Sequence, residues 1–144
     1  MATEIAILLW VVGALAGSMV FFAIVVAPKV FQSLPPDQAG VLLRSFFPSY
    51  YTWGLLLATS SALIAVWSNA ILSLACAAVA VLFVYARQIL MPKINDARDA
   101  QLRRDTEAGK RFNRLHLQSV VINGAQLLIL IGVAGGLVLV PPSG

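Results

Sequence analysis

Four polar side chains recur along one apolar segment near the end of the chain. His116, Ser119, Asn123 and Gln126 follow a 3-4-3 spacing, which places them on one face of an α-helix. Polar groups are costly to leave facing lipid, so this face is expected to point into a helix bundle. Two interpretations follow. The side chains could hydrogen-bond to neighbouring helices, or they could line a ligand-binding cavity with His116 at its mouth.

The residue types limit the chemistry that such a cavity could perform. His116 and Cys76 are the only histidine and cysteine, so a haem held by two histidines cannot form within one chain, and zinc or copper sites use several such ligands. Met19 and Cys76 are expected at depths far from His116, which leaves Met91 or a second chain's His116 as partners. A Ser/His hydrolase needs a third group that orients the imidazole, and the apolar segments hold no carboxylate. We assign no catalytic residue and no metal site, and haem stays open as a cofactor.

The composition indicates which elements position these residues. Of 144 residues, 60% are hydrophobic and 11% are charged, against roughly 45–50% and about 25% in soluble domains. This excludes a soluble enzyme, a disordered chain and a nucleic-acid-binding domain. Four nearly uncharged runs reach the ~20 residues that a membrane-crossing helix needs: residues 5–27, 50–67, 70–90 and 117–140. The sequence predicts an all-α, integral membrane four-helix bundle, a single domain over residues 1–144, in contact with the lipid bilayer.

The basic residues predict the orientation of this bundle. Two connectors, residues 28–48 and 91–115, hold nine of the Lys and Arg residues, and the remaining one, Arg87, lies close to the second connector. Cytoplasmic loops are enriched in Lys and Arg. We therefore expect both connectors in the cytoplasm and both termini on the extracytoplasmic side of the cytoplasmic (inner) membrane. Arg87 is expected to extend its head towards the cytoplasmic interface.

The connectors are also expected to be partly helical. Pro35-Pro36 predicts the start of a short interfacial helix after the first span, because proline suits the first helical turn. The basic connector between the third and fourth spans predicts helices that project into the cytoplasm, with a break at Gly109. The pair Ser68–Asn69 predicts a tight turn between the second and third spans.

Two glycine pairs suggest close helix packing. Gly13 and Gly17 in the first span, and Gly132 and Gly136 in the fourth, have the Gly-x-x-x-Gly spacing that allows helices to approach closely. The neighbouring helix could belong to the same bundle, to a second copy in a homo-oligomer, or to another membrane protein.

Three segments carry a resemblance to a known family. They are Phe31-x-Ser33-Leu34-Pro35 followed by Gly40, then Phe47-Pro48-x-Tyr50-Tyr51, and Phe112-x-Arg114-x-His116-x-x-Ser119-x-x-x-Asn123. With them, the chain resembles the transmembrane-protein-205-like family of four-span membrane domains of unknown function. That family is distantly similar to copper-resistance-D and HemJ-type membrane proteins. The resemblance implies a helical bundle and a common site for His116, Ser119 and Asn123.

Three hypotheses about function follow. The first is an inner-membrane protein with a cytoplasm-facing polar cavity, in transport or tolerance of a small molecule or metal complex. The second is a haem- or quinone-linked oxidoreductase that resembles the HemJ type. The third is a structural or assembly subunit of a membrane complex. Whether the protein is an enzyme stays open.

Overall fold

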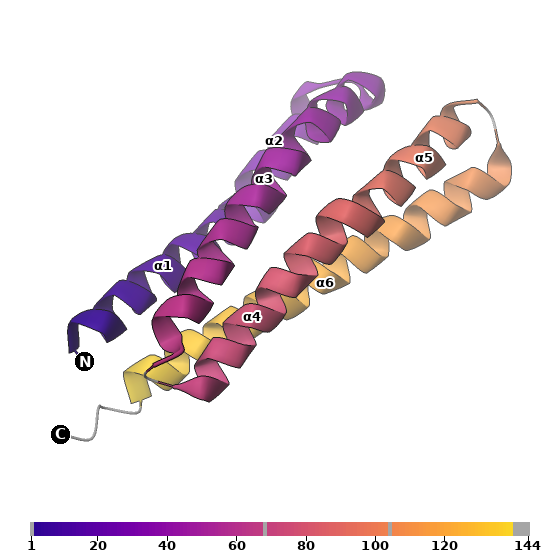
Figure 1. The fold of residues 1–144 in the computed structure, drawn as a ribbon. Helices are drawn as coiled ribbons and strands as arrows, with labels where there is room; N and C mark the ends of the chain where they lie inside the picture. Colours follow the sequence, from indigo (N-terminus) through magenta and orange to yellow (C-terminus); the bar gives the residue numbers. More distant parts are fainter. Residues whose placement is uncertain (1, 68, 104, 140–144) are drawn as a thin grey trace.

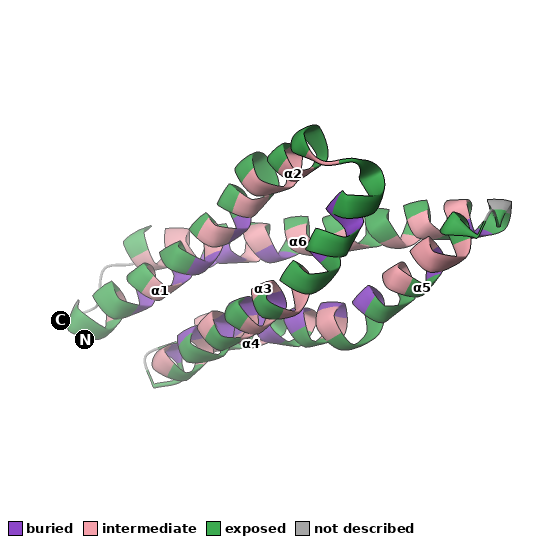
Figure 2. Ribbon diagram, turned by 90° about the horizontal axis from the view of Figure 1, so that it is seen from above, coloured by how far each residue is buried: buried purple, intermediate pink, exposed green. Residues whose placement is uncertain are grey.

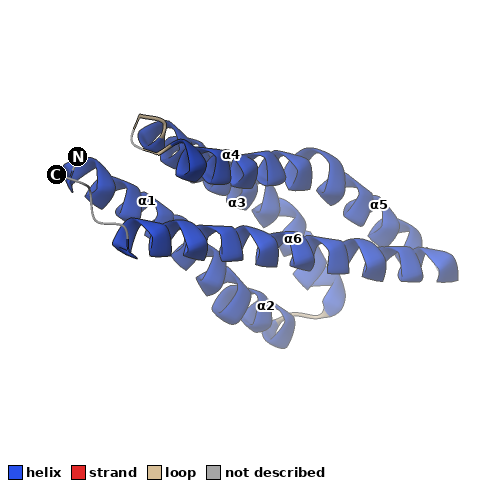
Figure 3. Cartoon of the chain, turned by 90° about the horizontal axis from the view of Figure 1, so that it is seen from below, coloured by secondary structure: helices blue, strands red, loops and turns tan. Residues whose placement is uncertain are grey.

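The computed structural model describes residues 2–67, 69–103 and 105–139. Every regular element in these ranges is helical, and none of them is a strand (Figure 3). In chain order the elements are α1 (Ala2–Phe21), the π-helical turn η1 (Phe22–Val26), α2 (Ala27–Ser33), α3 (Pro36–Ala65), α4 (Ala70–Tyr85), the π-helical turn η2 (Ala86–Leu90), α5 (Met91–Leu102) and α6 (Thr106–Leu139).

The helices run up and down in a bundle (Figure 1). The start of α1, the end of α6 and the α3–α4 turn lie at one end, and the α2–α3 and α5–α6 turns lie at the other, which we call the connector end. Helix α1 packs against α3 and α6, and α4 packs against the same two helices. The described helices therefore pack as an antiparallel bundle, which confirms the all-α prediction and is consistent with four helical rods.

The core follows from helical spacing. Along α1, Leu8, Val12, Leu15 and Met19 recur every three or four residues and are all buried, as expected for one face of a helix. Their opposite face is exposed, and Trp10 is 80% exposed. The buried residues lie along the inner faces of the helices (Figure 2). A bundle this small with large apolar side chains on its outside fits contact with lipid rather than water.

Three described helices are long and apolar enough to cross a membrane. They are Thr3–Ser33, Ala70–Leu102 and Glu107–Leu139, which contain the predicted spans 5–27 and 70–90 and the predicted span 117–140 up to Leu139. Helix α3 contains the predicted span 50–67 up to Ala65 and is 30 residues long. Its first half carries charge and its second half includes Thr59, Ser60 and Ser61, so it does not reach the same hydropathy. A fourth span there is consistent with the structure and stays a prediction.

The predicted short interfacial helix is not a separate element. Helix α3 begins at Pro36, as expected, but continues without interruption through Pro48 to Ala65. A proline inside a helix removes one backbone donor and can bend the axis without ending the helix. The helix that follows the first span is α2, which continues α1 through η1.

The predicted break at Gly109 is wrong. The chain turns between α5 and α6, at residues 103–105, and Gly109 lies inside α6. The reason is a helix cap: the Asp105 carboxylate accepts hydrogen bonds from the backbone N–H groups of Glu107, at 3.0 Å, and Ala108, at 3.2 Å. An aspartate in this position satisfies donors that a helix start otherwise leaves free.

The α3–α4 turn is short, as predicted. Helix α3 ends at Ala65 and α4 begins at Ala70, with the side chain of Asn69 accepting from Leu72 N at 3.0 Å. The Ser73 hydroxyl also donates to Ala62 O at 2.9 Å and joins the two helices. Three sets of residues named in the sequence analysis lie outside the described residues: Ser68, Arg104 and residues 140–144.

Candidate functional site

A cavity of about 1020 Å³ lies at the connector end of the bundle. One face of α6 forms a wall of it, through His116, Ser119, Val120, Asn123, Gly124 and Leu127. The spacing of 3, 1, 3, 1 and 3 residues keeps all six on one side of a helix. From Phe112, which also lines the cavity, to Leu127 the wall is about 22 Å long at helical rise. The volume is at the upper end of the range for small-molecule sites.

The structure brings three of the four predicted polar residues to this cavity. His116, Ser119 and Asn123 line it. Gln126 is 1% exposed and lies against α4 instead, where its side-chain nitrogen donates to Val79 O at 3.2 Å. Of the four polar residues, three therefore line the cavity, and the fourth joins α6 to α4.

The three cavity residues leave one acceptor without a partner. The Ser119 hydroxyl donates to His116 O at 2.7 Å, and the Asn123 amide nitrogen donates to Ser119 O at 3.0 Å. Among the described residues, no donor reaches the buried Asn123 Oδ1. Leaving a buried acceptor unpaired is costly. The imidazole of His116 stacks on the ring of Phe112, with 6.0 Å between the ring centroids.

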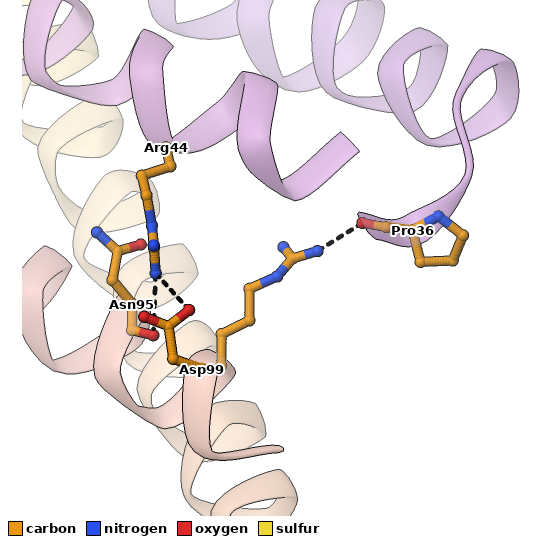
Figure 4. A network of polar contacts seen from close by, with 5 residues as sticks. Pro36, Arg44, Asn95 and Asp99 are labelled. Atoms are coloured by element: carbon orange, nitrogen blue, oxygen red, sulfur yellow. Dashed lines mark hydrogen bonds and ion pairs between the residues drawn. The ribbon is translucent and has the colours of Figure 1, made fainter. Parts of the chain in front are cut away.

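Charged residues join α3 and α5 at the end of the cavity nearest the α2–α3 and α5–α6 turns, which we call its outer end (Figure 4). The Arg44 guanidinium on α3 donates to Asp99 Oδ1 at 2.8 Å and to Asn95 O at 3.2 Å, both on α5. The Arg98 guanidinium, from α5, donates to Pro36 O at the start of α3. Arg98 forms no ion pair with a carboxylate in the described part of the chain.

The inner part of the cavity is aromatic and apolar. Phe22 from η1 contacts Tyr50, with ring centroids 4.9 Å apart, and Phe47 stacks on Tyr51 at 5.5 Å. All four rings line the cavity. Met19 and Met91 line it as well, so Met19 and His116 border the same cavity although they were expected at different depths. The cavity extends along the helices, and one space therefore spans both depths.

Each π-helical turn ends two residues before a proline. In η1 the N–H of Ala27 donates to Phe22 O, and in η2 the N–H of Met91 donates to Ala86 O, in both cases five residues back. Pro28 and Pro92 follow. A proline ring clashes with the preceding helical turn, and a π-turn widens that turn. Phe22, the first residue of η1, and Met91, directly after η2, both line the cavity, and π-turns are frequent at functional sites.

The predicted packing glycines lie mostly in open positions. A side chain built on Gly13, Gly17 or Gly132 would meet nothing within 4 Å, and one on Gly136 would reach only Leu72, at 3.6 Å. Packing of these positions against another chain stays a prediction. The tight glycines are ones that we did not predict: a Cβ on Gly54 would overlap the buried ring of Phe83, and one on Gly40 would overlap the Arg98 guanidinium.

Sequence reasoning also missed Arg44, Arg98 and the aromatic residues as cavity residues. The two arginines had been counted only as determinants of orientation. The one sequence feature that could have indicated that Arg44 and Arg98 lie close together was that both connectors were expected on the same side of the membrane. No spacing within a single segment could show that residues 36–44 meet residues 95–99.

The comparisons with known proteins identify a family without an assigned activity. No curated protein matches the chain, and no solved structure matches it. The model of a domain of unknown function, DUF4149, matches residues 10–103. This range includes the resemblance segments around Phe31 and Phe47 but not the one around His116. Because the match covers well over half of the 144 residues, the chain, a membrane-helical protein, belongs to the DUF4149 family.

Proposed function

We propose that this protein binds a small amphipathic molecule in the cavity at the connector end, as a step in its transport or in tolerance to it. The observation that supports the proposal is the division of the cavity. Arg98, Arg44 and His116, together with the carboxylate of Asp37, lie towards its outer end, and an aromatic and apolar surface lines its inner end. A ligand with an anionic or hydrogen-bonding head and an apolar body matches both ends.

The head of such a molecule would meet specific groups. The Arg98 guanidinium has a backbone carbonyl as its only described hydrogen-bond partner, and a guanidinium binds carboxylate or phosphate groups in a forked geometry. Asn123 lines the cavity deeper down and adds a polar side chain there. The body of the molecule would contact Phe22, Tyr50 and Leu127, and burial of apolar area there stabilises the complex.

Blocking the cavity tests this proposal. Gly124 lines the cavity, and a Cβ added there meets nothing within 4 Å, so Gly124→Leu should fill space without disturbing the bundle. We expect photolabelling of cavity residues by a diazirine-bearing palmitate in lipid nanodiscs to fall about tenfold, because the side chain takes the place of the probe. Mass-spectrometric mapping of the α6 peptide that starts after Arg114 measures this labelling.

Gly13→Leu is the matched control. Gly13 is equally open but does not line the cavity, so this variant should leave the labelling of α6 unchanged. Labelling confined to outward-facing residues such as Trp10 in the parent protein, or equal labelling of the two variants, would contradict the proposal.

The proposal also places the cavity on the cytoplasmic side of the inner membrane. The support is the concentration of Lys and Arg in the segments near the connector end. Cys76, the only cysteine, is buried, so single cysteines can report the orientation. A membrane-impermeant maleimide should label Ala70→Cys in spheroplasts and Lys110→Cys only in inverted vesicles. The reverse pattern would place the cavity on the other side.

A further inference from the structure

A second, smaller cavity lies on the outside of the bundle, separate from the one described above. Its volume is about 360 Å³, and it is lined by Pro48, Ser49, Thr52, Trp53, Leu56 and Arg87. Five of these residues come from α3 and one from η2, and none of them lines the larger cavity. We call this smaller cavity the Arg87 groove.

The charge in this groove has no partner among the residues that the structure describes. The Arg87 Nε atom is buried and forms no hydrogen bond to any described residue, and no described carboxylate pairs with its guanidinium. Arg87 lies within the candidate membrane-crossing helix Ala70–Leu102. An unpaired charge in such a helix is costly and is normally paired with an opposite charge. We therefore expect an anion to bind in the groove.

The neighbours of Arg87 indicate which anion. Trp53 is 50% exposed beside it, and tryptophan is typical of the boundary between lipid headgroups and acyl chains. Leu56 continues the apolar wall of the groove, and Ser49 adds a hydroxyl group. A phosphate on Arg87 would therefore have an apolar surface directly next to it, as the phosphate of a lipid requires.

We propose that the Arg87 groove binds the phosphate of an anionic phospholipid, with the guanidinium as the anion ligand and the surface of Trp53 and Leu56 in contact with the acyl chains. This inference does not rest on the function proposed for the larger cavity. It assigns Arg87 a role beyond extending its head towards the interface.

Native mass spectrometry of the detergent-purified protein tests the proposal. We expect the parent to retain phosphatidylglycerol in preference to phosphatidylcholine with the same acyl chains. Arg87→Gln should weaken phosphatidylglycerol retention about tenfold, because a charge-assisted hydrogen bond is lost, and should remove the preference. Arg87→Lys keeps the charge and should restore part of it.

Arg111→Gln is the matched control, because it removes one exposed positive charge outside the groove. If it lowers retention as much as Arg87→Gln does, the lipid binds the basic connector and the proposal is overturned. Equal retention of the two lipids by the parent would also overturn it. Binding of inorganic phosphate that depends on Arg87, without a preference for phosphatidylglycerol, would show a site for the free ion and overturn the lipid assignment.

A second measurement leaves every residue of the groove unchanged. Its result therefore does not depend on whether Arg87 variants fold. Trp10 and Trp67 are 80% and 93% exposed, so replacing both with phenylalanine leaves Trp53 as the only tryptophan. A small fraction of brominated phosphatidylglycerol in phosphatidylcholine vesicles should quench Trp53 fluorescence more than the same fraction of brominated phosphatidylcholine. Equal quenching would overturn the proposal.

Discussion

Replacing Gly54 with alanine is expected to destabilise the bundle by about 1–3 kcal/mol. Gly54 is buried on α3, and a Cβ there would overlap the ring of Phe83 on α4. The ring is fully buried, so it cannot move aside without shifting its neighbours. Unfolding of the purified protein by titration with sodium dodecyl sulfate, followed by circular dichroism, measures the change.

Gly13→Ala is the control for the same chemical change in an open position. A side chain there meets nothing within 4 Å, and alanine is favoured over glycine in a helix by up to about 1 kcal/mol. This variant should therefore be as stable as the parent or more so. Combining Gly54→Ala with Phe83→Leu should recover part of the loss, because the two sites are in contact. Equal stability of Gly54→Ala and Gly13→Ala would show that α3 and α4 are not tightly packed at Gly54.

Replacing Gln126 with alanine is expected to cost about 2–4 kcal/mol of unfolding free energy. The side chain is 1% exposed and donates to Val79 O. Truncation removes this bond and leaves an empty space between α6 and α4. A hydrogen bond between membrane helices contributes about 0.6 kcal/mol on average, so most of the expected loss comes from packing. The same detergent titration measures it.

Gln126→Leu separates these two contributions. Leucine has a similar volume and lacks only the hydrogen bond, so the cost should fall to about 1 kcal/mol or less. Gln118→Ala is the matched control: Gln118 is exposed and bonds to the Tyr85 hydroxyl at 3.0 Å, and its loss should change stability little. Because Gln126 does not line the cavity, Gln126→Leu should also keep the palmitate photolabelling of α6. If Gln126→Leu remains folded but loses the labelling of α6, Gln126 contributes to the ligand site and this prediction is wrong.

The local sequence pattern predicts where the helices lie better than it predicts where they end. The length and uniform hydropathy of the runs near α1, α4 and α6 predict helices because an apolar run must satisfy its own backbone hydrogen bonds in lipid. The start at Pro36 followed from proline chemistry. The break assigned to Gly109 failed because α6 already begins at Thr106, where Asp105 caps it, and one glycine inside a helix costs only about 1 kcal/mol.

The candidate site could be predicted only in part. The spacing of His116, Ser119 and Asn123 placed them on one helix face, and all three line the cavity. The same spacing could not show that Gln126, one turn further, would lie against α4. That outcome depends on how closely α4 approaches α6 at that depth, which residues far away in the sequence determine.

The sequence by itself determined the membrane character, the helical class and the polar face of α6, because each depends on composition or on spacing within one helix. The packing of the helices was needed to show that Arg44 pairs with Asp99, that Gly54 rather than Gly13 is the tight position, and that Arg87 has no partner among the described residues. The physical reason is that packing and ion pairing join residues from different helices. The distances between such residues depend on how the helices are rotated and how deep each one lies in the bundle. The spacing of residues within one helix determines neither of these.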